Sequence, residues 1–377
     1  MKSGSKGCGH RFHFEWSRAR ALIQIKQNRR SPLATTQNEI PQPLEPAPAR
    51  SMPKFKENVP LAKITNYKIG GPAQFFFEAR NEADIAWSIK EAKKRRVRCF
   101  ILGGGTNLLI GDAGWNGLVL KMNISGVIAK GTLLTAGAGV SMEKLTACAA
   151  KHSLAGLDWA GGLPGTLGGA IRGNAGCFGG EIKDNVKTVR SFNTKTMRFV
   201  TRNAAECRFG YRTSVFKQHP GEIILGATFR MKKGSEKEIR ATLRKEKTWR
   251  TTHHPLEYPS AGSVFKNVPL SDIFAPRSKP YRDAVKNLSL NYRNSSFSVK
   301  TDPVPVIAAA KLIGESGLAG VRRGGATISR KHTNFIVNTG GATANEVLSL
   351  MALIQAKVYR KFGLRLEPEI QIVRPTK

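Results

Sequence analysis

The sequence predicts an α+β fold organised in more than one domain. Short apolar strands alternate with segments in which apolar residues recur at helical spacing. Two separate glycine-rich stretches interrupt this pattern in the first two thirds of the chain. At Ser235 the chain changes character, because Ser235-Glu-Lys-Glu238 has the form of a capping box and opens a helix with Ile239, Leu243 and Trp249 on one face. We take Ser235 as the beginning of a second, smaller domain.

Composition limits the classes of function. The chain has 377 residues, of which 40% are hydrophobic and 23% charged, as in soluble globular proteins. Its net charge of +35 favours anionic partners, but the basic residues are spread along the chain without a nucleic-acid-binding signature. No apolar run approaches the roughly 20 residues of a membrane span. The five cysteines and seven histidines lack metal-ligand spacing. We expect a reduced, cytoplasmic protein with no metal site, no membrane span and no specific nucleic acid.

Residues 1–53 are predicted to be a disordered basic tail. They carry a net charge of about +6 and end in a Pro-rich stretch with little to bury. An organellar transit peptide is one alternative, since the opening is Arg-rich and poor in acids. Another is a misassigned start, with Met52 as the true first residue. Ordered structure is expected from Lys54.

The first glycine-rich stretch follows a helix and a strand. Asn81 is positioned to cap a helix that extends to about Arg96, and Phe100–Leu102 is a short buried strand. The strand leads into Gly103–Asn107, three glycines followed by Thr and Asn. Such a loop presents backbone N–H groups to a pyrophosphate, although a simple glycine-bracketed turn would look similar.

The second stretch, Leu157–Glu181, is the most glycine-dense part of the chain. Glycine is used where the backbone turns with positive φ or lies against a ligand. A flexible linker is the alternative, but linkers lack the regularly placed apolar residues found here, such as Leu163 and Leu167. The pattern is neither a P-loop nor G-x-G-x-x-G. Two such loops in one domain suit a dinucleotide.

Five motifs together resemble one known family. The stretch G-G-L-P-G-T-L-G-G-A…N-A-G resembles the second FAD-contacting loop of the UDP-N-acetylenolpyruvoylglucosamine reductases, the MurB flavoenzymes. The first loop, G-G-G-T-N-L-L, resembles that of FAD proteins with the vanillyl-alcohol-oxidase-type fold. F-G-Y-R-T-S-V-F, S-A-G-S-V-F-K-N and L-E-P-E follow in the family's order. The resemblance extends from about Asn58 to Val373.

The resemblance implies a two-subdomain FAD-binding fold of the vanillyl-alcohol-oxidase/PCMH type plus a smaller α+β substrate domain. The FAD-binding domain would span residues 54–233, with subdomains of about 54–122 and 123–233. The substrate domain would span 234–377. Residues 268–305 depart from the family pattern as a longer, basic insertion, to which the sequence assigns no role.

The implied activity is reduction of the enolpyruvyl group of UDP-N-acetylglucosamine enolpyruvate, which gives UDP-N-acetylmuramate for peptidoglycan synthesis. NADPH would be the reductant and non-covalent FAD the carrier, since no His or Cys stands beside Gly103–Asn107. The spacing resembles the shorter type of the family. A monomer is expected. An FAD-dependent sugar or alcohol oxidase of the same fold is the alternative enzyme, and a basic nucleic-acid-binding protein is the non-enzymatic alternative.

The resemblance also implies site residues. The implied catalytic residues are Ser263, which would give the proton to C2 with its pKa lowered by Lys266, and Arg212 and Glu369, which would flank the substrate carboxylate and the developing enolate. The implied substrate-binding residues are Tyr211, Lys266, Asn267 and Arg322. Many relatives carry Lys where this chain has Ala319, so Arg322 or Arg323 would have to supply that charge. The implied FAD-binding residues are Gly103, Gly104, Gly105, Thr106, Asn107, Gly161, Gly162, Pro164, Gly165, Thr166, Gly168, Gly169, Asn174 and Gly176.

Overall fold

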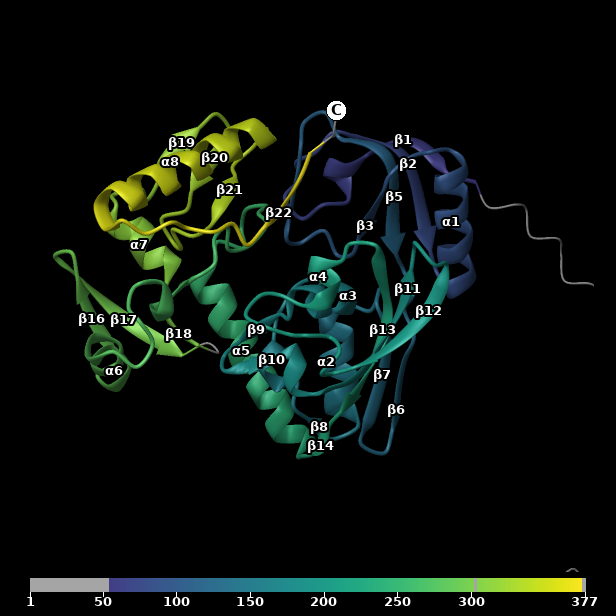
Figure 1. The fold of residues 1–377 in the computed structure, drawn as a ribbon, viewed down its shortest axis with the longest axis horizontal. Coiled ribbons are helices and arrows are strands. Elements are labelled where there is room, and N and C mark those ends of the chain that lie inside the picture. The colour runs from purple at the N-terminus through teal and green to yellow at the C-terminus, as the bar shows by residue number, and fades with distance from the viewer. Residues whose placement is uncertain (1–53, 302–303, 375–377) are drawn as a thin grey trace, which may run out of the picture. The chain divides into compact units, whose positions relative to one another are not determined.

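The computed structural model describes residues 54–301 and 304–374, all within one compact unit that begins at Pro53 (Figure 1). The predicted tail therefore lies outside the described residues. The helices are α1 (Glu82–Lys94), α2 (Met142–Lys151), α3 (Leu167–Gly173), α4 (Val215–Gln218), α5 (Glu236–His253), α6 (Lys279–Lys286), α7 (Ala309–Glu315) and α8 (Ala344–Phe362). Short two-residue strands are β8 (Leu154–Ala155), β9 (Gly176–Cys177), β10 (Gly180–Glu181) and β14 (Lys232–Lys233).

The first sheet has the order β1 (Lys56–Pro60), β2 (Pro72–Ala79), β5 (Trp115–Met122) and β3 (Cys99–Leu102). The last three of these strands are parallel, and α1 connects β2 to β3. The predicted helix cap is confirmed, since the Asn81 side chain accepts from the N–H of Asp84 at 2.9 Å. Ile85 and Ile89 bury one face of α1.

The second sheet is antiparallel, with the order β12 (Arg198–Asn203), β11 (Val186–Asn193), β13 (Glu222–Arg230), β7 (Leu133–Gly137) and β6 (Val127–Lys130). The sequence predicts a hairpin from Val186–Phe192 and Met197–Thr201, after the second glycine stretch, and β11–β12 confirms it. Ser141 caps α2 by accepting from the N–H of Lys144 at 3.1 Å. The largest buried cluster combines residues of this sheet with α2 and α3.

Helix α8 carries the core of the C-terminal part. The predicted capping box is present, because the side chains of Thr343 and Glu346 each accept from the other's backbone N–H. Gly363 ends the helix at φ +69°. The strands β19 (Arg322–Arg323), β20 (Ala326–Ile328) and β21 (Ile336–Asn338) form a sheet beside it.

The insertion at residues 268–305 is folded, and α5 buries less of its apolar face than its spacing suggests. Residues of the insertion form α6 and a sheet of β15 (Val268–Pro269), β18 (Pro305–Ile307), β17 (Ser295–Thr301) and β16 (Ser289–Tyr292). Ile307 therefore lies in a strand, and the next helix begins only at Ala309. In α5 only Ile239 is buried, whereas Trp249 is 39% exposed and packs on Phe178 and His253. Of the predicted apolar face, only Ile239 is therefore fully buried.

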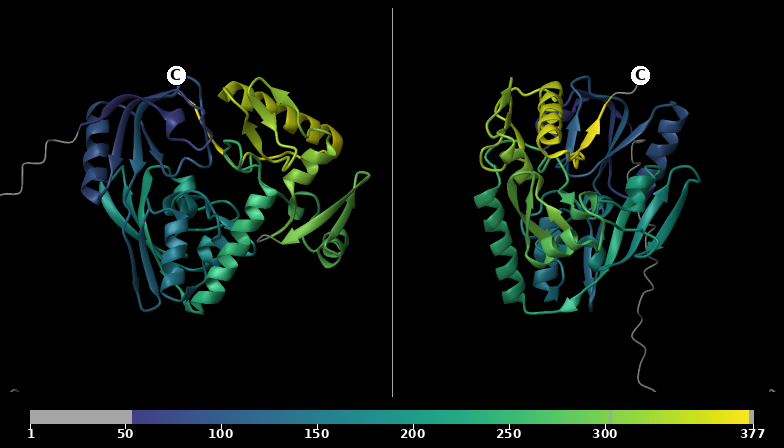
Figure 2. Two further views of the ribbon diagram at one scale, coloured as in Figure 1. Left: turned by 180° about the vertical axis from the view of Figure 1, so that it is seen from behind. Right: turned by 60° about the vertical axis from the view of Figure 1, so that its left-hand side comes forward.

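The chain ends in a strand that returns to the N-terminal part. β22 (Gln371–Val373) pairs in parallel with β4 (Leu108–Ile110), directly after the first glycine loop (Figures 1 and 2). The sequence predicts the last strand at Leu364–Ile370, around the L-E-P-E motif, but among the described residues that segment makes a single isolated bridge, between Phe265 and Pro368. The end of the chain thus links the first glycine loop to the C-terminal part. The predicted domain boundaries themselves stay predictions.

Candidate active site

The first glycine loop, Gly103–Asn107, is held by its own peptide groups. The N–H of Asn66 donates to the carbonyl of Gly105 at 3.0 Å, and Lys121 donates to the carbonyl of Gly103. Gly105 has φ +69°, and a Cβ there would lie 2.9 Å from the carbonyl oxygen of Ile64. A larger residue would not fit, so the loop conformation is set before any ligand binds.

The second glycine loop packs directly against the first. A Cβ on Gly104 would lie 2.7 Å from the Cα of Gly165, and one on Gly103 would lie 2.7 Å from Oγ1 of Thr166. Gly165 has φ +102°, and its own Cβ would lie 2.8 Å from Oγ1 of Thr106. The backbones of the two predicted loops therefore meet with almost no side chain between them.

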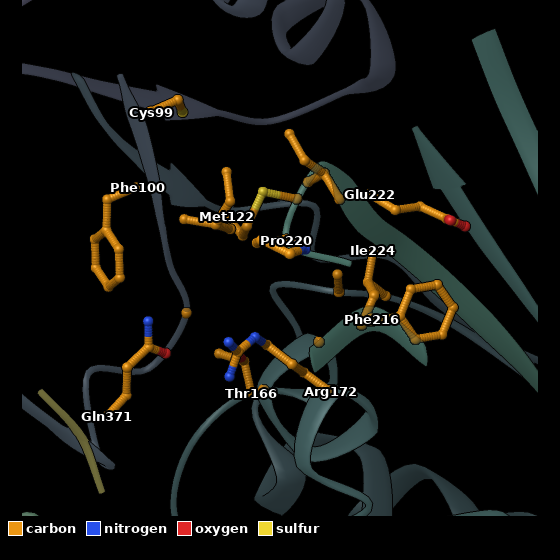
Figure 3. A pocket seen from close by; sticks show the side chains of 16 residues that line it. Cys99, Phe100, Met122, Thr166, Arg172, Phe216, Pro220, Glu222, Ile224 and Gln371 are labelled. Carbon is orange, nitrogen blue, oxygen red and sulfur yellow. The ribbon is translucent and has the colours of Figure 1, made fainter. Parts of the chain in front are cut away.

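Both loops contribute to one cavity between the two sheets (Figure 3). Thr166 and Arg172 both line it, whereas the carboxylate of Glu222 is turned away and accepts from Arg202 at 2.8 Å. The buried hydroxyl of Thr166 has no hydrogen-bond partner in the described part of the chain. The lining residues are Cys99, Phe100, Ile101, Gly103, Met122, Ala138, Thr166, Gly168, Gly169, Arg172, Phe216, Pro220, Glu222, Ile223, Ile224 and Gln371.

These residues fit part of an FAD molecule. An unpaired buried hydroxyl is costly and indicates a ligand atom as its partner. Arg172 supplies a positive charge for a phosphate; burial lowers its pKa, but a guanidinium remains protonated in proteins. Cys99 also lines the cavity, but burial raises the pKa of its thiol to about 12, so it remains protonated near neutral pH.

Several other predicted FAD-binding residues have neighbours within the protein. A Cβ on Gly161 would lie 2.3 Å from the carbonyl oxygen of Leu243, and one on Gly162 would lie 3.2 Å from Lys247, so both glycines allow α5 to approach. The carbonyl of Gly161 accepts from Arg250 at 2.9 Å. These contacts show that close packing against α5 is sufficient reason for glycine at both positions. Contact of either residue with FAD stays a prediction.

Asn174 also has a structural role. It ends α3 at φ 44°, its amide donates to the carbonyl of Gly210 at 3.0 Å, and its oxygen accepts from the N–H of Lys183 at 3.1 Å. Asn107 donates to the carbonyl of Glu369 at 3.2 Å and its own carbonyl accepts from Gln371. Both amides therefore fix the loops rather than point freely into the cavity. Pro164 and Gly169 are exposed.

The structure brings Arg212 and Glu369 together. Nε of Arg212 donates to Oε1 of Glu369 at 3.1 Å, and NH2 donates to the carbonyl of Gly176 at 2.8 Å. The two side chains are 13% and 25% exposed. Partial burial raises the pKa of Glu369, and the positive charges of Arg212 and Lys217 oppose that rise. The site thus holds a carboxyl group that retains its proton more readily than usual.

The segment that contains Ser263 runs alongside that of Glu369. The N–H of Glu369 donates to the carbonyl of Val264 at 2.8 Å, and the N–H of Lys266 donates to Glu367 at 2.9 Å. Gly262 has φ +79° and open space around its Cα. The Ser263 hydroxyl makes no hydrogen bond to any residue that the structure describes. Ser263, Arg212 and Glu369 therefore lie on three converging segments.

Asn334 fixes the Ser263 segment, and the sequence analysis gave it no role. Its amide oxygen accepts from the N–H of Phe265 at 3.0 Å, and its amide nitrogen donates to the carbonyl of Phe265 at 2.8 Å. It is only 3% exposed. An Asn followed by the apolar run Phe-Ile-Val was the available signal, because a buried amide must be paired.

The predicted substrate residues are distributed unevenly. Tyr211 adjoins the site, with Cζ of Arg212 5.1 Å from its ring centre. Lys266 pairs with Glu367 at 2.8 Å, and the oxygen of Asn267 accepts from the N–H of Ala309 at 3.1 Å. Arg322 lies on the exposed strand β19 and donates to Gly324, within its own hairpin. Within the described residues, the side-chain hydrogen bond of Arg322 stays in its own hairpin and does not reach the segments of Arg212, Ser263 or Glu369.

Residues 54–301 and 304–374 contain neither a candidate metal site nor a candidate membrane span. No group of His, Cys, Asp or Glu side chains in this range is arranged to hold a metal ion. No helix in it is both long and apolar enough to cross a membrane.

Comparisons with known proteins cover almost the whole described chain. Residues 73–196 match the family model described as an FAD binding domain, and residues 254–373 match the model for the C-terminal domain of UDP-N-acetylenolpyruvoylglucosamine reductase. The prediction of an α+β fold that binds FAD is confirmed by these matches.

The similar proteins that align over most of their length are named as UDP-N-acetylenolpyruvoylglucosamine reductases, like the second family model. A UDP-N-acetylenolpyruvoylglucosamine reductase from Lachnoclostridium phytofermentans is 37% identical over 84% of this chain and 92% of its own length. One from Anoxybacillus flavithermus is 36% identical over 84% and 94%. The crystal structure of the reductase from Thermus caldophilus aligns with a TM-score of 0.65 and 28% identity, over 85% of this chain and all of that one.

Proposed function

The chain belongs to the UDP-N-acetylenolpyruvoylglucosamine reductase family, and on that premise we propose how its residues share the reaction. It is a flavin-dependent oxidoreductase that uses NADPH to reduce UDP-N-acetylglucosamine enolpyruvate to UDP-N-acetylmuramate in peptidoglycan synthesis. FAD, when bound, accepts a hydride from NADPH and supplies it to C3 of the enol ether. The family membership decides against a sugar or alcohol oxidase.

The two glycine loops hold FAD without a covalent bond. Backbone N–H groups of the loops, the unpaired hydroxyl of Thr166 and the guanidinium of Arg172 form the polar side of the cavity. Cys99 is the cysteine in the cavity lining, and its raised pKa makes it a poor nucleophile. Denaturation is therefore expected to release FAD intact.

Arg212 and Glu369 bind the enolpyruvyl carboxylate and stabilise the charge that develops at C2. Hydride addition to C3 leaves an enolate-like centre, and a preorganised guanidinium beside it lowers the barrier. Glu369 orients Arg212 through the 3.1 Å bond, and its raised pKa increases the fraction that can donate a hydrogen bond to the enolate. The observation that carries this proposal is that Arg212 bonds Glu369 while the segment of Ser263 runs alongside that of Glu369.

Ser263 gives the proton to C2. A serine hydroxyl is a weak acid, but the enolate is a strong base, and the cations Arg212 and Lys266 near it favour the ionised hydroxyl. Gly262, at φ +79°, leaves the backbone free to direct the side chain. In the structure both cations are paired with a carboxylate, Lys266 with Glu367 and Arg212 with Glu369.

The half-reactions of Ser263→Ala test this role. We expect NADPH to reduce the bound flavin at close to the parent rate, and the enolpyruvyl substrate to reoxidise it at least about 100-fold more slowly. Ser263→Cys, with a more acidic proton, should recover part of the second rate. Ser289→Ala, which removes an exposed hydroxyl on β16, is the control. Parental reoxidation by Ser263→Ala would exclude Ser263 as the proton donor.

The remaining partner assignments follow from the reaction. We propose that the enzyme works in the cytoplasm, where UDP-sugars and NADPH are available. A monomeric state and the lack of a specific nucleic-acid partner stay predictions, as do the roles of Tyr211, Asn267 and Arg322.

A further inference from the structure

Arg212 has a backbone conformation that needs outside support. Its φ is 54°, in the left-handed region that residues with a Cβ rarely adopt. Such conformations persist only where surrounding contacts hold them, and they gather at functional sites. From this conformation the guanidinium bonds both Glu369 and the carbonyl of Gly176.

The ends of the Arg212 loop are held against the end of α3. Ser214, fully buried, donates to the carbonyl of Arg172 at 2.7 Å, and Asn174 donates to the carbonyl of Gly210 at 3.0 Å. Gly210 and Thr213 exchange two backbone bonds across the loop. None of these four bonds involves the peptide groups of Arg212 itself.

Lys217 bonds the backbone of Arg212 directly. It lies on α4, one turn beyond the loop, and its Nζ donates to the carbonyl oxygen of Arg212 at 2.8 Å. That carbonyl defines the peptide plane after Arg212, so fixing it fixes the direction in which the arginine side chain leaves the backbone.

The charges around Lys217 argue against a chance surface contact. Lys217 is half-buried and faces Lys266, Arg172 and Arg212, with Glu369 as the one anion among the groups that perturb it. Burial, followed by these three cations, lowers the pKa of Lys217, whereas Glu369 raises it. A second ammonium group in this position is unfavourable by itself, so its contact with Arg212 and its attraction to Glu369 must compensate.

We propose that Lys217 is a positioning residue for the reduction step: it holds Arg212 in the left-handed conformation from which the guanidinium contacts Glu369 and the enolpyruvyl carboxylate. This inference rests on the role of Arg212 in the proposed function. Lys217 acts through Arg212 and does not touch the reacting atoms.

The first test compares Lys217→Met with Lys217→Arg in the holoenzyme. Methionine keeps the apolar stem but cannot donate to the carbonyl of Arg212, so reoxidation of the flavin by the enolpyruvyl substrate should slow by about 10- to 100-fold. Lys217→Arg should stay within about threefold of the parent, since it keeps a charged donor. Flavin content and Tm should be nearly the same in both. Lys361→Met, which removes a lysine–carbonyl bond to Glu315 away from the site, is the matched control.

The second test is a double-mutant cycle with Arg212→Ala. If Lys217 acts through Arg212, Lys217→Met should slow the Arg212→Ala enzyme by less than about twofold, although it slows the parent strongly. An equal loss in both backgrounds would show that Lys217 acts independently and would overturn the inference. So would a severe loss in Arg212→Ala together with parental kinetics in Lys217→Met.

The cycle also separates this inference from the proposed function. Parental turnover in Arg212→Ala would disprove the catalytic role of Arg212, and with it any role of Lys217 through that residue. Should Lys217→Met fail to fold, Lys217→Gln replaces it. A large defect in Lys217→Gln with near-parental rates in Lys217→Arg supports the inference, and equal rates in the two contradict it.

Discussion

The glycine loops proposed to bind FAD are built from backbone atoms, whereas the proposed reducing site is built from side chains. The loops are made of backbone: Gly104 and Gly165 touch where any side chain would collide. The proposed reducing site consists of side chains, those of Arg212, Ser263 and Glu369, which come from three segments far apart in sequence. The loops require glycine because a side chain would collide, whereas the proposed reducing site requires particular side chains.

This difference determines how each part fails. Adding a methyl group at Gly104 should force the two loops apart, because the colliding atoms belong to the backbone of Gly165 and cannot rotate away. Removing a side chain from the reducing site leaves the fold and the flavin in place and takes away one interaction with the transition state. Substitutions in the two parts are therefore expected to separate flavin binding from turnover.

Gly104→Ala should have the largest effect. Its Cβ would lie 2.7 Å from the Cα of Gly165, well inside contact distance, so the loops must separate and the purified protein should be nearly colourless. Flavin absorbance per protein is the measurement. Gly126→Ala is the control, since a Cβ there meets nothing within 4 Å. Full flavin content in Gly104→Ala would mean that the loop contact does not shape the FAD site.

Arg212→Ala and Glu369→Gln should affect turnover and not flavin content. Loss of one group that stabilises developing charge typically reduces kcat by roughly 10²–10³-fold. Arg212→Ala should show the full loss, and Glu369→Gln a smaller one, because the glutamine amide still offers a hydrogen bond to the enolate. Steady-state kinetics on flavin-matched samples give the comparison. Near-normal kcat in both variants would show that the reducing site lies elsewhere.

The two parts also differ in how well the sequence predicts them. The glycine loops were located from local composition alone. A high density of glycine indicates positive φ, and Gly105 and Gly165 do have positive φ. The same holds for α8, whose cap at Thr343 and stop at Gly363 are local signals. Ser263, Arg212 and Glu369 were named through family resemblance, because nothing local brings them together.

Features that depend on distant contacts were missed. Lys217 is one of 61 Lys and Arg residues, and only the fold places its ammonium on the carbonyl of Arg212. Trp249 has the right spacing for a buried face, but Phe178 and His253 cover it at the surface instead. β22 forms at Gln371 because β4 offers it a parallel partner, a contact between opposite ends of the described chain. All three features depend on contacts between residues that are not neighbours in sequence.

The smallest expected effect concerns stability and the proton on Glu369. Burial raises the pKa of Glu369 above its usual 4.5, against the opposing charges of Arg212, Lys217 and Lys266. A raised pKa means that the folded protein holds this proton more tightly than the unfolded chain does. The stability that the protonated form contributes is therefore complete below about pH 4.5 and is lost as the pH rises through the folded pKa.

Glu369→Gln keeps a neutral side chain at every pH, so the parent should lose stability relative to this variant as the pH rises from about 4.5 through the raised pKa of Glu369. The expected difference is a few degrees in Tm, measured on both holoenzymes. Glu367→Gln provides a control of opposite sign. Its hydrogen bond with Lys266 lowers the pKa of Glu367, so the parent should be the more stable protein above the usual pKa and lose that advantage as the pH falls. Because Glu367 is 73% exposed, solvent screening should make its effect the weaker of the two. If both variants shift in the same direction with pH, the proton on Glu369 is not held by burial, and the reducing site is as solvent-accessible as the Lys266–Glu367 pair beside it.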